Sequence, residues 1–136
     1  MDERNLFPEV FRAMRDVAPR AVVIENVKSL IRGSFRPYVE YVKLQLSMPE
    51  IQPEAPERWL EHAEVLRRLT TKSGSNGVAG HLRYTVTKRL LNAVNYGVPQ
   101  KRQRVFIVAI RREMRPERPE LEWRGVPGTH SEDALL

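Results

Sequence analysis

The sequence predicts an α/β fold, and three observations lead to this prediction. Apolar side chains recur at helical spacing between residues 6 and 17. A short uninterrupted apolar run at residues 21–24 follows, and such a run is typical of a strand buried on both faces of a parallel sheet. A second apolar run at residues 105–110 predicts another strand. A helix followed by a buried strand is the repeating unit of α/β folds.

Three helices are predicted from apolar residues at intervals of three and four. In the first, Asn5 can cap the N-terminus, Pro8 fits the first turn, and Pro19 ends the segment. The second helix is predicted from residue 35 to residue 46. The third is predicted over residues 57–70.

One more strand and several connections complete the chain. Residues 84–91 alternate in the manner of a strand. Residues 48–56 contain three prolines and residues 73–80 are rich in glycine and serine, so both are predicted to be connections, the second of them flexible. Prolines and charges dominate residues 114–136, where little regular structure is expected.

Composition restricts the classes of function. The 136 residues, 41% of them hydrophobic, suit one domain. A net charge of +6 and a pI of about 10.1 favour a polyanionic partner. The chain has no cysteine, which excludes disulfides, thiolate metal sites and a cysteine nucleophile. Its three histidines are widely spaced, so no metal site is expected. The polar N-terminus and the lack of a long apolar stretch favour a cytoplasmic location without membrane contact.

Glu25 is the first candidate for catalysis because it follows the apolar run at residues 21–24. Ligands of open α/β sheets bind beyond the carboxyl ends of the strands. Asn26 can form a local hydrogen bond that holds the turn after the strand. From this segment alone, a surface glutamate that caps the next helix is an equally good interpretation.

A second candidate site combines Gln100, Arg102 and Arg104. Arg102 and Arg104 lie two apart at the start of the predicted last strand, so their side chains share one face of it. Gln100 would project from the same face if the strand begins early enough. Two guanidinium groups on one face suit a phosphate or a base carbonyl. Gly97 and Pro99 would form the rigid turn that positions them. The alternative is a solvated basic strand end, so this run by itself only suggests nucleic acid.

Four segments in this order resemble the cytosine-5 DNA methyltransferases. The segments are residues 4–9, Glu25-Asn26-Val27, residues 90–104 and Thr129-His130-Ser131. The third segment ends in a Gln-x-Arg-x-Arg motif. Before the fourth segment, Gly128 stands where the family has a proline.

The resemblance implies a partial Rossmann-like methyltransferase fold over residues 1–136. The half with the cofactor loop and the target-recognition domain would be missing, and residues 48–83 would be an insertion. Residues 114–136 would be an irregular tail that leads to the target-recognition region. The chain is therefore expected to be a fragment or subunit that is inactive alone, because the family's catalytic cysteine is absent.

The family transfers a methyl group from S-adenosylmethionine to carbon 5 of a cytosine that has left the duplex. By resemblance, Glu25 is the acid at ring nitrogen 3 and acts from a closed pocket. Arg104 would hold the carbonyl oxygen of the base, and Arg102 would anchor the sugar-phosphate. Gln100 would lie with them on the DNA-binding face.

Three further residues take roles by resemblance. Asn26 and Val27 would shape the wall of the base pocket, and Leu6 would approach the cofactor.

The expected partners are double-stranded DNA and a complementary chain that carries the cofactor loop and the family's Pro-Cys-Gln nucleophile. Two alternatives remain open. One is a non-catalytic, basic nucleic-acid-binding remnant of the family, and the other is a piece of its tRNA-methylating branch.

Overall fold

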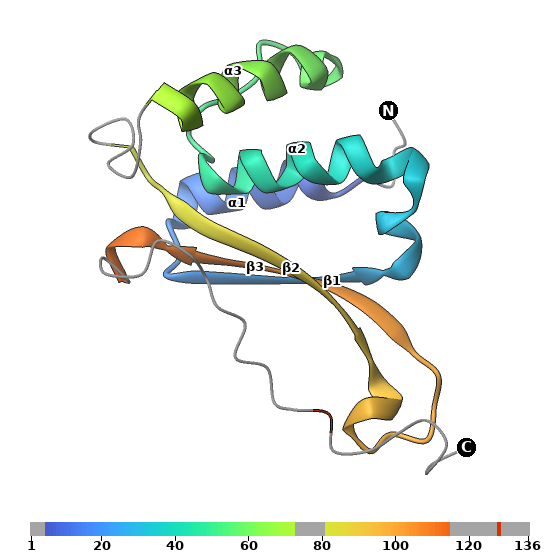
Figure 1. Cartoon of the computed structure of the whole chain (residues 1–136). Coiled ribbons are helices and arrows are strands. Elements are labelled where there is room, and N and C mark those ends of the chain that lie inside the picture. The colour runs from blue at the N-terminus through green and yellow to red at the C-terminus, as the bar shows by residue number, and fades with distance from the viewer. Residues whose placement is uncertain (1–4, 73–80, 115–127, 129–136) are drawn as a thin grey trace.

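The computed structural model describes residues 5–72, 81–114 and Gly128 (Figure 1). The glycine-rich stretch at residues 73–80 and the segment at residues 129–131 lie outside the described residues. The main elements in chain order are α1 (Phe7–Val17), β1 (Ala21–Val27), α2 (Arg36–Ser47), α3 (Trp59–Lys72), β2 (Tyr84–Asn92) and β3 (Gln103–Arg111). No helix among these residues is long and apolar enough to cross a membrane.

The three strands form one sheet in the order β1-β3-β2, and both pairings are antiparallel. The prediction that residues 21–24 form a parallel strand buried on both faces is wrong for the described chain. Residues along β1 alternate between exposed and half-buried, because helices cover only one face of this strand. An apolar run therefore identified the strand correctly, but it did not show what covers each side.

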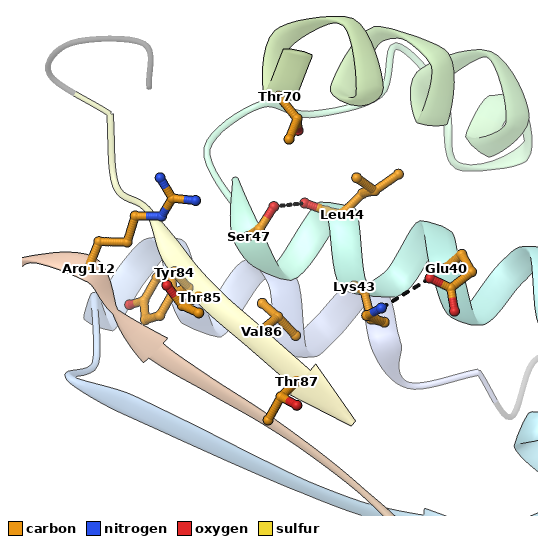
Figure 2. A pocket seen from close by; sticks show the side chains of 10 residues that line it. All are labelled: Glu40, Lys43, Leu44, Ser47, Thr70, Tyr84, Thr85, Val86, Thr87 and Arg112. Carbon is orange, nitrogen blue, oxygen red and sulfur yellow. Dashed lines mark hydrogen bonds and ion pairs between the residues drawn. The ribbon is translucent and has the colours of Figure 1, made fainter. Parts of the chain in front are cut away.

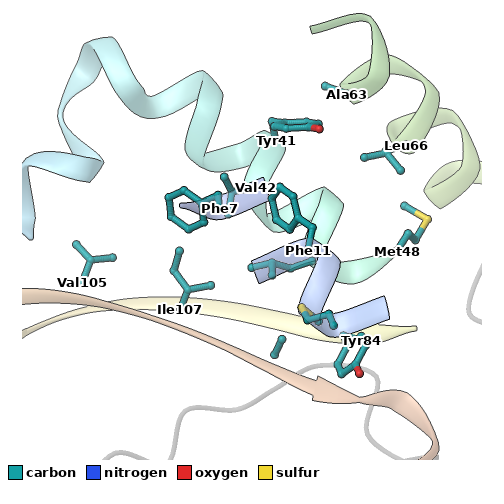
Figure 3. Close-up of a cluster of buried hydrophobic side chains, with 13 residues drawn as sticks. Phe7, Phe11, Tyr41, Val42, Met48, Ala63, Leu66, Tyr84, Val105 and Ile107 are labelled. Carbon is teal, nitrogen blue, oxygen red and sulfur yellow. The ribbon is translucent and has the colours of Figure 1, made fainter. Parts of the chain in front are cut away.

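Helices α1 and α2 lie on one face of the sheet, with α3 above α2 (Figure 1). Val105, Ile107 and Ala109 of β3 are buried beneath the helices. They pack with Phe11 of α1 and Leu46 of α2 in the core (Figure 3). The opposite face of the sheet is left open among the described residues.

The ends of α1 follow from its sequence. The N-cap position is Leu6, which has no side-chain cap, so the predicted cap Asn5 lies one residue too early. Asn5 Oδ1 nevertheless accepts a hydrogen bond from the N–H of Phe7, the first helical residue, at 3.2 Å. The helix ends at Val17, and Ala18 adopts a left-handed conformation with φ of 45°. Its N–H donates to the Met14 carbonyl at 3.0 Å. The helix therefore stops before Pro19, as predicted.

The segment at residues 48–83 contributes a helix to the core. Ala63 and Leu66 of α3 are buried against α2, which confirms the predicted apolar face. The helix begins at Trp59, two residues later than predicted, because Pro56–Arg58 form a 3-10 turn. Trp59 packs against Tyr38 and Tyr41 with ring centroids 5.3 and 5.7 Å apart.

His62 of α3 is a buried titratable group in this core. Its Nδ1 lies 3.2 Å from the hydroxyl oxygen of Tyr41. Burial lowers the pKa of His62 below its ordinary value of 6.5, because the charged imidazolium loses its solvation. Burial also raises the pKa of Tyr41 to about 12.

The lowered pKa of His62 predicts that stability decreases in mild acid. The unfolded chain binds the proton at a higher pH than the folded chain does. The free energy of unfolding is therefore expected to fall as the pH drops below about 6.5. Urea unfolding at a series of pH values from 8 to 5 measures this dependence. The variant His62→Gln should lose part of the decrease, and an unchanged pH profile would contradict the assignment.

Candidate active site

The Glu-Asn-Val motif lies inside β1 and does not follow it. The pairing with β3 continues to Val27, which is opposite Arg104, so the strand is longer than its apolar run. Glu25 and Val27 project from the exposed face of β1. The local hydrogen bond predicted for Asn26 is present, since its Oδ1 accepts from the Val27 N–H at 2.8 Å.

Glu25 and Arg104 form an ion pair across the sheet. The Nε atom of Arg104 lies 2.8 Å from Oε1 of Glu25. Glu25 is opposite Phe106, two residues beyond Arg104 on β3, so the pair is diagonal and lies on the open face. Arg104 Nη1 also donates to the Gln103 carbonyl at 2.9 Å. The sheet thus brings together the acid and one arginine of the two predicted motifs.

The other members of the Gln-x-Arg-x-Arg motif lie on the turn that precedes β3. The strand begins at Gln103, so the expectation that Arg102 belongs to it is wrong, and the condition under which Gln100 would share its face is not met. The Gln100 N–H donates to the Val98 carbonyl at 2.7 Å, and the Arg102 N–H donates to the Gln100 carbonyl at 2.9 Å. These tight turns interrupt the extended backbone. Both side chains are exposed.

Gly97 shapes the start of this turn. It ends the 3-10 turn Ala93–Tyr96 in a left-handed conformation with φ of 85°, which favours glycine. Gly128 lies beside the same turn, because a Cβ at Gly128 would be 3.2 Å from the backbone oxygen of Asn95. Gly128, the described residue that precedes the family's fourth segment in the sequence, therefore lies close to the turn before the arginines.

A cleft of about 630 Å³ opens beside the ion pair. Leu6, which immediately precedes α1, and Glu25 and Asn26 of β1 line it, so three predicted site residues meet there. Its other walls are mostly apolar. Clefts of this size with few polar groups are typical of small-molecule sites.

Sequence reasoning missed the aromatic wall of this cleft. Phe35, Tyr38 and Trp59 line it, and Phe35 is 52% exposed. Asn5 donates a side-chain hydrogen bond to the Tyr38 hydroxyl. Burial raises the pKa of Tyr38. Helical spacing predicted that Phe35, Tyr38 and Trp59 lie on apolar faces of helices. Nothing in the sequence around them distinguishes an aromatic residue that lines a cleft from one that is buried in the core.

The described residues do not close the cleft over the acid. The Glu25 side chain is 48% exposed and that of Arg104 is 25% exposed. Leu6, at the start of α1, is 69% exposed. The closed pocket expected around Glu25 is thus not formed by this part of the chain.

The fold is a small α/β unit that is compatible with part of a methyltransferase fold. Residues 64–132 match the family model of the C-5 cytosine-specific DNA methylases. The chain belongs to this family.

Curated relatives support the assignment. The chain is 32% identical over 114 residues to the type II methyltransferase M.BspRI of Lysinibacillus sphaericus, covering 83% of this chain and 19% of that protein. It is 29% identical over 112 residues to M.NgoMIV of Neisseria gonorrhoeae, covering 82% and 25%. It is 30% identical over 103 residues to M.AquIA of a Picosynechococcus species, covering 76% and 32%. The chain thus spans a third or less of these relatives' lengths.

Because the Glu25–Arg104 ion pair is exposed, its contribution to the free energy of unfolding is expected to be small and to depend on salt. Water and ions screen such pairs, so a double-mutant cycle of Glu25→Ala and Arg104→Ala should give about 0.2–1 kcal/mol at low salt. Urea unfolding of the four proteins measures it. The coupling should shrink in 1 M NaCl.

The pair Glu64 and Arg67, on the surface of α3, is a matched control of the same charge type. Its coupling should be similarly small. A Glu25–Arg104 coupling that does not respond to salt would contradict a screened ion pair.

Proposed function

We propose that this chain provides the base-binding part of a DNA (cytosine-5) methyltransferase. The observation that carries this proposal is the ion pair between Glu25 and Arg104, because Glu25 also lines a mostly apolar cleft. The two residues come from separate motifs of the family and meet only in the folded sheet. Membership of the family supplies the reaction class.

The pair complements the edge of a cytosine ring. That edge presents a carbonyl oxygen, an acceptor ring nitrogen and an amino group. A guanidinium can donate to the carbonyl oxygen, while a protonated carboxyl group donates to the ring nitrogen and accepts from the amino group. Arg104 and Glu25 would exchange their mutual bond for bonds to the base. Glu25 would then neutralise the charge that builds on the ring when a nucleophile adds to it.

The base must leave the duplex to reach these groups, because a stacked ring is inaccessible. Arg102 and Gln100 are exposed on the turn before β3 and would contact the sugar-phosphate backbone. Asn26 and Val27 flank Glu25 on β1 and would form part of the base pocket.

The cleft offers S-adenosylmethionine an apolar surface for its ring system, but the family's glycine-rich cofactor loop is not in this sequence. Leu6 and the aromatic wall give an apolar surface on which a ring system can pack. When bound, this cofactor would supply the methyl group. Leu6 is the residue of this chain proposed to contact it.

The chain has no cysteine, and the family's nucleophile is a cysteine thiolate. We therefore propose that the chain works with a complementary chain that carries the thiol and the cofactor loop. A non-catalytic, DNA-binding remnant is the competing function. The two proposals differ in whether activity can be restored.

Both proposals predict weak DNA binding that depends on salt. Affinity for a duplex should fall steeply between 50 and 200 mM salt, with little preference for sequence, because phosphate contacts dominate. Fluorescence anisotropy with labelled duplexes measures this. Arg102→Ala should reduce the log-log salt slope by about one.

Arg67→Ala is the control for that measurement, since Arg67 is an exposed arginine paired with Glu64 on α3. Its slope should match that of the unmodified chain. Affinity that is independent of salt would argue against a phosphate-binding surface.

Reconstitution tests the catalytic proposal. The chain alone should not incorporate tritiated methyl groups into DNA. With a complementary chain that carries the cofactor loop and Pro-Cys-Gln, activity should appear. In that complex Glu25→Gln should lower the chemical rate by about 10²–10⁴-fold, because glutamine cannot donate a carboxyl proton.

Two controls accompany this experiment. Glu25→Gln should leave DNA affinity nearly unchanged, whereas Arg104→Ala should weaken both base capture and turnover. Glu9→Gln, at an exposed position on α1, should be neutral. Turnover by the chain alone would refute the need for a second chain, and a near-normal rate for Glu25→Gln would show that Glu25 is not the acid.

A further inference from the structure

Strand β2 leaves half of its backbone groups on a free edge of the described sheet. The Arg112 N–H donates to the Arg83 carbonyl at 2.9 Å, and the Ala93 N–H donates to the Arg102 carbonyl at 3.0 Å. Because bonding alternates along an antiparallel pair, these bonds assign the odd-numbered residues of β2 to the ladder with β3.

The even-numbered residues Tyr84, Val86 and Lys88 therefore direct their N–H and C=O groups away from β3. Within the described part of the chain, the sheet has no strand on that side of β2. An edge of this kind is a template for another strand.

A groove of about 410 Å³ runs along the first half of this edge (Figure 2). Four consecutive residues of β2, numbers 84–87, line it, so the groove follows the strand's backbone and not one of its faces. Ser47 of α2 and Thr70 of α3 lie on the opposite side. The groove is thus bounded by two helices and a strand edge.

The two helix hydroxyl groups in the groove, those of Ser47 and Thr70, are oriented as acceptors. Ser47 Oγ donates its proton to the Leu44 carbonyl at 2.7 Å, and Thr70 Oγ1 donates to the Leu66 carbonyl at 2.9 Å. Their oxygen lone pairs remain available for an incoming N–H group. With the outward carbonyls of β2, the groove offers several acceptors and only a few backbone donors.

Positive charge surrounds the groove. Lys43 and Lys88 share one carboxylate, Glu40, at 3.1 and 2.5 Å. Arg112 lines the other end of the groove. Beside it lies Arg83, whose buried Nη1 has no hydrogen-bond partner among the described residues. Arg111, Glu50 and Glu113 also lie close enough to act on Tyr84 in the groove. Together these groups make five cations and three carboxylates, which leaves a net positive charge.

We propose that the free edge of β2 binds an extended acidic peptide segment of a partner protein as an additional strand. Peptide N–H and C=O groups match the alternating groups of Tyr84 and Val86, and acidic side chains match the cations. A DNA backbone fits less well, because its phosphodiesters have no donor for the carbonyl and hydroxyl oxygens. This inference is independent of the proposed catalytic function.

Labelled peptides test the proposal by fluorescence anisotropy with the full chain. The probe is Glu-Val-Glu-Val-Glu-Val, and saturable binding is expected. The lysine analogue Lys-Val-Lys-Val-Lys-Val should bind at least tenfold more weakly. The acidic peptide with every amide N-methylated should also bind at least tenfold more weakly, because it keeps its charge but loses its donors.

Three results would overturn the proposal. They are no saturable binding of the acidic probe, equal binding of its N-methylated form, and stoichiometric displacement of the probe by a 12-base-pair duplex. The second result would indicate charge attraction alone. The third would assign the groove to DNA.

Chain variants locate the binding site. Lys43→Glu should weaken probe binding at least tenfold, whereas Lys28→Glu, an equal charge change at an exposed residue outside the groove, should not. Val86→Pro removes one outward N–H without removing a ladder bond, so it should weaken binding as well. Circular dichroism and the thermal midpoint would verify that each variant is folded. If these three variants bind the probe equally, the groove is not the site.

Discussion

The register of β3 is the constraint on which the arrangement of this molecule depends. The strand bonds to β1 on one side and to β2 on the other. Its alternate residues Val105, Ile107 and Ala109 are buried under the helices. Burial of this set fixes which residues face the open side. A slip of one residue would bury Arg104 and expose the apolar set, so the cost of slipping is the loss of the core.

The same alternation creates the candidate active site. Arg104 lies one residue before the first buried position of β3 and therefore on the open face, where it meets Glu25 of β1. Neither residue is close to the other along the chain. Helices α1 and α2 pack on the covered face of the sheet. Their N-cap residues, Leu6 and Phe35, line the cleft. The packing of the helices on the covered face of the sheet thus fixes which side chains of β1 and β3, Glu25 and Arg104 among them, lie on the open face.

Sequence patterns were informative where one local signal determines structure. Helical spacing located all three helices to within about two residues, and the predicted cap Asn5 lies one residue before the N-cap Leu6. The patterns failed at boundaries set by pairing. Glu25 lies within β1 because Val27 still pairs with Arg104, and Arg102 lies outside β3 because tight turns precede Gln103. The composition of an apolar segment does not show which strand pairs with it, or whether that pairing is parallel or antiparallel.

By itself, the sequence determined the family and the candidate residues, because motifs such as Glu25-Asn26-Val27 are local and their order along the chain is readable. The absence of cysteine is also a property of the sequence alone. Only the tertiary structure decided that Glu25 pairs with Arg104 and that Trp59, from the segment at residues 48–83, lines the cleft beside it. It also decided which backbone groups of β2 face outward. These features depend on contacts between residues distant in sequence, which arise only when the sheet register and the helix packing bury one common core.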